Sequence, residues 1–235
     1  VVEFLEANPA RAESVLKTLL ALLVRANSTS EATGSRLLML TKAYIKRHNQ
    51  IEDLLQVFHS VLLRTAHPAR LFEIILHSLA QAVIPNDDRN KRELLPLSQM
   101  RSANKKHGNI ADIEFVIHGE IVEAWEAKFE KTYLLEEVGE IEDKLKNWQT
   151  AKRVGFVVYG TPYFDGELRK RIEDVTRRTG VVLEVLSFDQ WVGMFVEETH
   201  LTSEDVSGLW ITAVAETLSG NRRAIAPIDE PSDIW

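Results

Sequence analysis

Residues 110–129 read IADIEFVIHGEIVEAWEAKF, and they decide the fold. Apolar and polar residues alternate along both arms of this segment, and a spacing of two is the period of a β-strand. The residues His118-Gly119-Glu120 between the arms are typical of a turn. The segment therefore predicts a β-hairpin, with strands over 110–117 and 121–129 and a three-residue turn.

This hairpin would gather charged side chains on one face. Residues two apart on a strand point the same way, so Glu126 and Lys128 share a face. With a three-residue turn, Asp112 lies directly opposite Glu126, with the Cβ atoms about 5 Å apart. The other face is apolar, apart from Glu123, and we expect it to pack on a core. Its members are Ile113, Phe115, Ile117, Ile121, Trp125, Ala127 and Phe129.

Two carboxylates that close repel each other, and a divalent cation would relieve the repulsion. Carboxylate oxygens bind Mg²⁺ or Mn²⁺, and the backbone carbonyl of Ala127 is a further candidate ligand. Such a site suits phosphodiester hydrolysis, because the metal polarises the phosphate and activates water. Lys128 would orient the nucleophile or offset charge in the transition state.

A solvated hairpin face with a cross-strand ion pair is the alternative interpretation, and such a pair contributes little stability. The apolar residues Val116, Val122 and Ala124 are expected on the same face as the charges. They indicate partial burial, where unpaired carboxylates would be costly. We therefore favour a metal site formed by Asp112, Glu126 and Lys128.

The order Asp112-Ile113-Glu114-Phe115 and then Trp125-Glu126-Ala127-Lys128-Phe129 resembles the signature of the PD-(D/E)xK nuclease superfamily, which includes many restriction endonucleases. The resemblance covers roughly residues 69–196. It implies that Asp112 and Glu126 bind metal and that Lys128 is catalytic. Ala111 stands where the signature has proline, although family members often lack it.

Several acidic residues have more than one interpretation. Glu73 resembles an extra acidic ligand that some family members supply from the first core helix, but it also fits ordinary surface charge. Glu114 is expected to face solvent, with contact to a second metal as the alternative. Asp87 and Asp88 follow Pro85 and imitate the literal PD order, yet they lie in a loop, so we favour Asp112.

The rest of the chain predicts helices before the hairpin and alternating helices and strands after it. The expected fold is α/β, a restriction-endonuclease-like core with a mixed central sheet flanked by helices and an α-helical N-terminal region. A loop at 27–30 and a break at Gly34 are expected between the first helix and a second helix over 36–47. Expected helices cover 36–47, 51–64, 69–84, 133–151, 165–179, 188–196 and 203–218, with strands at 154–159 and 181–186. The corresponding regions are helical 1–66, nuclease-like 67–200 and a C-terminal helix with an acidic tail, 201–235.

A basic segment precedes the hairpin although the whole chain has a net charge of -7. We expect this loop to contact DNA phosphates, and a mobile solvated loop is the alternative. The DNA-binding candidates, including one residue after the hairpin, are Arg89, Lys91, Arg92, Arg101, Lys105, Lys106 and Lys131.

The sequence thus predicts a Mg²⁺-dependent DNA endonuclease, similar to type II restriction enzymes and acting on duplex DNA. Symmetric cutting of both strands predicts a homodimer. A noncatalytic nuclease-fold module of a larger defence or repair assembly is the alternative. No phosphate-binding P-loop or metalloprotease motif is present. The absence of cysteine excludes disulfides and favours a reducing compartment such as the cytoplasm.

Overall fold

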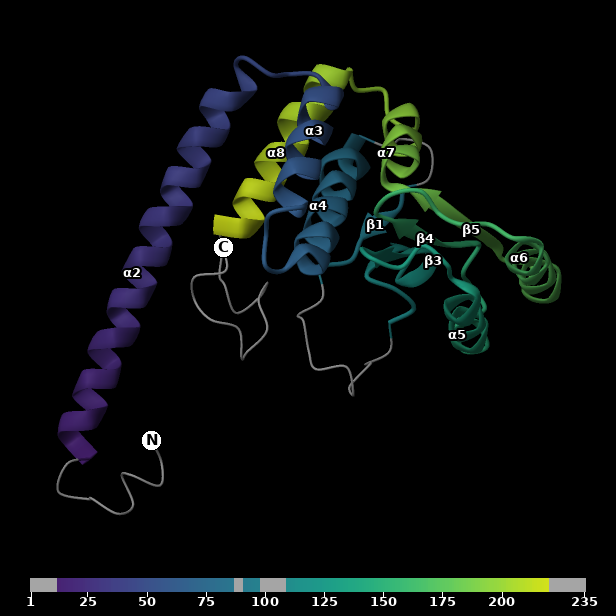
Figure 1. The fold of residues 1–235 in the computed structure, drawn as a ribbon, viewed down its shortest axis with the longest axis horizontal. Coiled ribbons are helices and arrows are strands. Elements are labelled where there is room, and N and C mark those ends of the chain that lie inside the picture. Colours follow the sequence, from purple (N-terminus) through teal and green to yellow (C-terminus); the bar gives the residue numbers. More distant parts are fainter. Residues whose placement is uncertain (1–11, 87–90, 98–108, 220–235) are drawn as a thin grey trace.

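The computed structural model describes residues 12–86, 91–97 and 109–219, which form helices followed by a sheet with interleaved helices (Figure 1). The helices are α2 (Ala12–Ile45), α3 (Ile51–Leu62), α4 (Pro68–Val83), α5 (Leu135–Leu145), α6 (Gly166–Thr179), α7 (Phe188–Glu197) and α8 (Ser203–Ser219), with the 3₁₀ turn η2 (Ile84–Asn86). The strands are β1 (Glu93–Leu94), β2 (Ile113–Ile117), β3 (Glu120–Lys128), β4 (Arg153–Val158) and β5 (Val182–Ser187).

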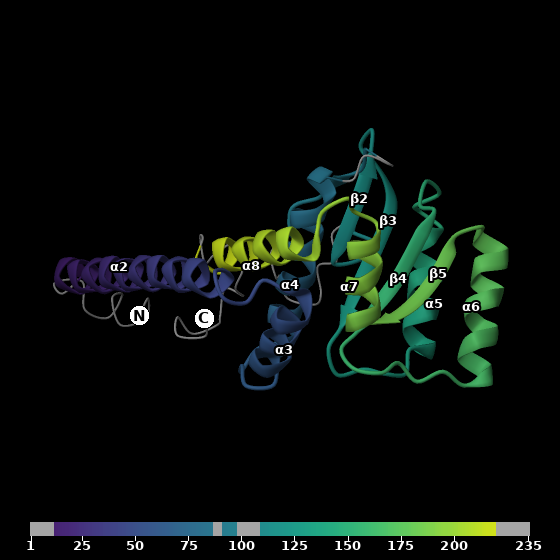
Figure 2. The same ribbon diagram turned by 90° about the horizontal axis from the view of Figure 1, so that it is seen from above.

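The five strands form one mixed sheet in the order β1-β2-β3-β4-β5. The pairs from β1 to β3 are antiparallel, and the pairs from β3 to β5 are parallel. Figure 2 shows α5 and α6 on one face of the sheet and α7 on the other. The expected α/β class, mixed sheet, N-terminal helices and parallel pairing after the hairpin are all confirmed.

Alternate residues of the strands build two separate cores. Trp125 and Val157 pack with side chains of α3, α4, α7 and α8. Ala124 and Phe156, each one position before Trp125 and Val157, pack with side chains of α5 and α6. Because successive strand residues point to opposite faces, both sides of the sheet are buried. The apolar underside predicted for the hairpin is confirmed for Ile113, Phe115 and Trp125, which are fully buried.

The hairpin turn is shorter than predicted, yet the predicted register survives. His118 and Gly119 form a two-residue turn with positive φ angles of 51° and 80°, the backbone that favours tight hairpins. Phe115 pairs with Glu123 and Val116 with Ile121, so Val122 is an extra residue, a β-bulge. Beyond this bulge, Ile113 pairs with Trp125, which is the pairing that a three-residue turn would have given.

Helix α2 is continuous, so the expected loop at 27–30 and the break at Gly34 are wrong. Gly34 instead allows a close approach to α8. A Cβ at this position would lie 2.9 Å from Cβ of Ser219. The N-terminal half of α2 extends away from the rest of the protein (Figure 1). Its exposed apolar side chains are Leu16, Leu20, Leu22 and Val24.

Helix α8 joins the N-terminal helices to the layer beside the sheet. It packs against both α2 and α4, and its Trp210 donates an indole hydrogen bond to the Ile75 carbonyl of α4 at 2.8 Å. Within the described ranges, none of the helices is long and apolar enough to span a bilayer.

Gly155 in β4 supplies a test of the packing. A Cβ there would lie 2.6 Å from Cε3 of the buried Trp125 and 2.9 Å from the Glu184 carbonyl oxygen. Overpacking of this kind costs about 1–3 kcal/mol or more, so Gly155→Ala should lower the free energy of unfolding in urea by at least this amount. Gly193→Ala, in α7 with open space around it, should be neutral or stabilising. Equal stability of the two variants would contradict the packing.

Candidate functional site

The three predicted site residues lie where β3 ends beside the beginning of β2. Glu126 and Lys128 are among the last three residues of β3, and Asp112 directly precedes β2. The side chains of Glu126 and Lys128 are 19% and 23% exposed. They are therefore sheltered by the protein but open to a ligand.

The Ala127 backbone joins Asp112 to β3. Its N–H donates to Asp112 Oδ2 at 2.9 Å, just beyond the last pair of the β2–β3 ladder. On the other edge of β3, the Tyr159 N–H donates to the Lys128 carbonyl at 2.9 Å. Because the polar groups of successive strand residues point to alternate edges, the Ala127 carbonyl points to the Asp112 edge. That direction is compatible with its predicted role as a ligand.

Glu126 lies between two lysines. Lys128 Nζ donates to Glu126 Oε1 at 3.0 Å. Lys144 Nζ, from α5, lies 3.9 Å from Glu126 Oε2 and donates to the Ile110 carbonyl at 2.5 Å. Lys144 was not among the predicted site residues. A signal for it exists in the sequence, because Lys144 follows the buried Ile141 by three positions and so lies near the buried face of α5.

Glu73 reaches the same region from α4. Its Oε2 accepts a hydrogen bond from the buried Arg70 at 2.5 Å, and its side chain is 19% exposed. Burial raises the pKa of Glu73, Arg70 opposes that rise, and the Glu126 charge adds to it. Because a charge shifts a pKa only at short range, the effect of Glu126 on Glu73 indicates that the two side chains are neighbours. The alternative of an ordinary surface charge is therefore disfavoured for Glu73.

Asp112 is the most perturbed carboxyl group of this cluster. Burial raises its pKa well above the ordinary value, and the charges of Glu126 and Glu73 raise it further. The Ala127 N–H and Lys128 offset part of this rise. Burial alone would lower the pKa of Lys128, but Glu126 and Asp112 raise it above its ordinary value, so the ammonium stays protonated.

The donor set fits a hard divalent cation, although the ligands are not preassembled. Among the described residues, no three carboxylate or imidazole groups are arranged to hold a metal ion. Each carboxylate binds a protein donor instead: Asp112 the Ala127 N–H, Glu126 Lys128 and Glu73 Arg70. Carboxylates and a carbonyl are nevertheless the ligands that Mg²⁺ and Mn²⁺ prefer. The raised pKa of Asp112 indicates negative charge that a cation would stabilise.

Arg92 has a different environment from the one that the sequence indicated. It is buried, and its guanidinium binds Glu123 and, at 2.7 Å, Glu198. It also lies over the Phe115 ring, 5.0 Å from the centroid. These contacts explain why Glu123 occurs on the apolar underside of the hairpin. Arg92 is therefore not a candidate for DNA binding, because its guanidinium is buried and paired with Glu123 and Glu198.

Other predicted basic residues are exposed or lie outside the described ranges. Lys91 is exposed. Lys131 is also exposed and forms ion pairs with Glu136, at 3.7 Å, and with the buried Glu137. The residues outside the described ranges are Arg89, Arg101, Lys105 and Lys106, together with the alternative aspartates Asp87 and Asp88.

Glu114 braces the backbone and does not face solvent. It is buried, and its Oε1 accepts hydrogen bonds from the backbone N–H groups of Ile110 at 2.6 Å and Ala111 at 3.3 Å. The expectation of a solvated side chain is therefore wrong. Glu114 fixes the segment that leads into Asp112.

Models of known protein families gave no match to this sequence, and neither did the sequences of curated proteins.

The buried position of Arg92 predicts a large effect on stability. Arg92→Met would leave Glu123 as a buried charge without its guanidinium partner, and breaking a buried pair costs about 3–5 kcal/mol. The adjacent Lys91→Met, at an exposed position, should change the free energy of unfolding by less than about 0.5 kcal/mol. Chemical denaturation of both variants measures the difference, and a stable Arg92→Met variant would argue against the buried network.

The raised pKa of Asp112 predicts a pH-dependent gain in stability for Asp112→Asn. Because the pKa is raised in the folded protein, ionisation of Asp112 destabilises the fold as the pH rises from the ordinary aspartate value through the raised one. An asparagine does not ionise, and its oxygen can still accept the Ala127 hydrogen bond. At pH 7 we expect a Tm a few degrees above wild type, roughly the effect of 1 kcal/mol in a chain of this length.

Thermal unfolding followed at several pH values tests this sign. The Tm advantage of Asp112→Asn over wild type should shrink toward pH 3, where the Asp112 carboxyl group of wild type is protonated in the folded and in the unfolded protein. A variant that is less stable than wild type at pH 7, or an advantage that grows at acid pH, would contradict the burial of an ionised Asp112.

Proposed function

We propose that this protein is a Mg²⁺-dependent DNA endonuclease that hydrolyses phosphodiester bonds in duplex DNA, similar to type II restriction enzymes. The observation that carries the proposal is the hydrogen bond from the Ala127 N–H to Asp112, which brings that carboxylate beside Glu126 and Lys128. Two carboxylates and a lysine at one end of a hairpin form the arrangement that the PD-(D/E)xK resemblance implies.

The order of elements supports a restriction-endonuclease-like core. Helix α4 precedes the β2–β3 hairpin, and helix α5 and the parallel strand β4 follow it. The same order was expected from the resemblance. The strands, the helices on both faces and the position of the site at the end of the sheet are compatible with this fold.

In the proposed site, Asp112, Glu126 and the Ala127 carbonyl would hold Mg²⁺, with Mn²⁺ as a substitute and Glu73 as an additional acidic ligand. When bound, the cation supplies charge stabilisation at the phosphate and a more acidic water molecule. Lys128 keeps its proton at neutral pH, because Glu126 and Asp112 raise its pKa. Its role is therefore that of a positive charge beside the scissile phosphate, and not that of a general base.

We propose contacts to the DNA backbone for the predicted basic residues other than Arg92, which is buried and paired inside the protein. The net charge of -7 makes a general electrostatic attraction to DNA unfavourable, so binding would depend on local basic groups. Lys131 would have to exchange its ion pair with Glu137 for a phosphate. The proposed DNA-binding residues are Arg89, Lys91, Arg101, Lys105, Lys106 and Lys131.

A homodimer is part of the proposal, because two sites related by twofold symmetry would cut both strands of a palindromic target. The N-terminal half of α2 supports an intermolecular role, in dimerisation or in target recognition. It extends from the body of the protein (Figure 1) and exposes Leu16, Leu20, Leu22 and Val24. Leu16, Leu20 and Val24 recur every four residues and so share one side of the helix, and a contiguous exposed apolar surface is typical of an interface.

Cleavage of plasmid and genomic DNA in the presence of Mg²⁺ tests the proposal. Lys128→Ala should reduce the cleavage rate by about 10²–10³, the usual effect of removing one group that stabilises transition-state charge. Lys146→Ala is the matched control, since Lys146 is exposed and pairs with Asp143, and it should cleave at the wild-type rate. A discrete fragment pattern would favour a restriction enzyme.

Two results would overturn the proposal. One is equal metal-dependent cleavage by wild type and Lys128→Ala, which would place the chemistry elsewhere. The other is the absence of cleavage of every single-stranded, double-stranded or RNA substrate with both Mg²⁺ and Mn²⁺. The second result would favour the noncatalytic nuclease-fold module.

A further inference from the structure

Helix α5 reaches the candidate site through Lys144, a residue that the PD-(D/E)xK signature does not include. The helix lies on the face of the sheet shared with α6 (Figure 2). Ile141 and Leu145 anchor it in the core, and the Lys144 side chain between them is 22% exposed. Its ammonium is thereby held near two parts of the site.

The first contact fixes the backbone that leads into Asp112. Asp112 lies before β2, so the sheet ladder does not hold it. Lys144 Nζ binds the Ile110 carbonyl at 2.5 Å, and Glu114 binds the Ile110 and Ala111 N–H groups. Lys144 therefore holds the segment before Asp112 through a carbonyl group, and Glu114 holds it through two N–H groups. Glu114 belongs to the hairpin, whereas Lys144 comes from α5.

The second contact is electrostatic. Lys144 Nζ lies 3.9 Å from Glu126 Oε2, while Lys128 binds Oε1 of the same carboxylate. The acidic groups of the site are Glu73, Asp112 and Glu126, with the buried Glu114 beside them, and the cations that contact them or lie among them are Arg70, Lys128 and Lys144. Lys144 thus offsets part of the negative charge that these carboxylates bring into a sheltered region of the free protein.

We propose that Lys144 is a positioning residue of the site: it holds Asp112 through the Ile110 carbonyl and Glu126 through their ion pair, so that both carboxylates are in place before the reaction. This inference rests on the proposed nuclease function. Lys144 holds the two proposed ligands in position and does not itself contact the reacting atoms. Its loss should misplace the two carboxylates and so weaken the binding of a divalent cation.

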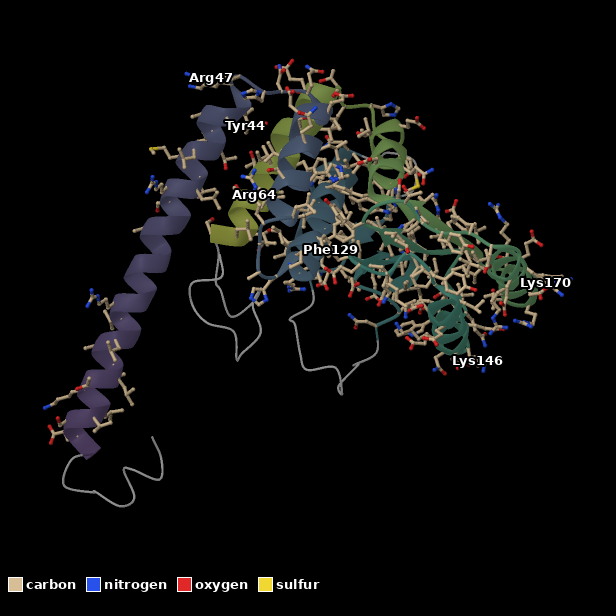
Figure 3. The ribbon with its side chains drawn as sticks, in the orientation of Figure 1. Tyr44, Arg47, Arg64, Phe129, Lys146 and Lys170 are labelled. Atoms are coloured by element: carbon tan, nitrogen blue, oxygen red, sulfur yellow. The ribbon has the colours of Figure 1, made fainter. Side chains whose placement is uncertain are left out.

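The test compares Lys144→Met and Lys144→Arg with Lys146→Met. Methionine keeps the length and apolar stem of lysine but has no charge, and arginine restores the charge and the donors. Lys146 lies two positions further along, as the C-cap residue directly after α5 (Figure 3), and its side chain is 71% exposed. Three quantities are measured in the full chain: hydrogen exchange of the Ile110 and Ala111 amides, Mn²⁺ affinity by calorimetry, and kcat and KM for DNA cleavage.

For Lys144→Met we expect at least fivefold faster exchange of these amides, a Mn²⁺ affinity at least threefold lower than that of wild type, and a kcat at least tenfold lower with KM within threefold. Lys144→Arg should recover the Mn²⁺ affinity and kcat to within threefold of wild type, and Lys146→Met should match wild type in every measurement. If Lys144 had no positioning role, Lys144→Met would leave the Mn²⁺ affinity unchanged, and arginine would not restore the rate.

The inference is overturned if Lys144→Met matches wild type in amide exchange or in Mn²⁺ affinity, or if Lys146→Met has the same effects. Failure of the proposed function is a separate result, because it appears as the absence of DNA cleavage by wild type. In that case the measurements of amide exchange and Mn²⁺ affinity still decide whether Lys144 positions the two carboxylates.

Discussion

The register between β2 and β3 is the constraint on which the candidate site depends. A slip of one residue would turn each side chain of a strand to the opposite face of the sheet. The two-residue turn alone would impose a different register, and the bulge at Val122 corrects it before the strands reach the site. The hydrogen bond from Ala127 to Asp112 then continues the pairing beyond the end of β2. A local irregularity in the hairpin therefore sets the distance between the two catalytic candidates.

The charges of the site are partly offset by cations from three different elements. Lys128 comes from the hairpin itself, Arg70 from α4 and Lys144 from α5. The carboxylates can therefore lie together in a partly buried place without a metal ion, but burial still raises the pKa of Asp112. Burial of these charges lowers the stability of the free protein, and the same negative charge would stabilise a bound divalent cation. The helices on both faces of the sheet are thus part of the site, and they do more than cover a core.

Strand and helix periodicity in the sequence predicted the hairpin, its buried underside and the alternation of helices and strands, because periodicity reflects local backbone geometry. Contacts between distant residues were not predictable in this way. Arg92 was interpreted as a surface charge, since nothing local indicates its pairing with Glu123, 31 residues away. Lys144 lies 34 residues from the carbonyl that it binds. Gly34 looked like a helix break, but the close approach of α8 explains it.

Joint binding of a divalent cation by Asp112 and Glu126 can be observed by anomalous diffraction from crystals grown with Mn²⁺. We expect one strong anomalous peak that is coordinated by both carboxylates, with the Ala127 carbonyl turned toward it. The same crystals of Asp112→Asn should show a much weaker peak at this position. No peak beside Asp112 and Glu126 at saturating Mn²⁺, or a peak elsewhere while Lys128 and Lys144 still contact Glu126, would contradict a metal site shared by the two carboxylates.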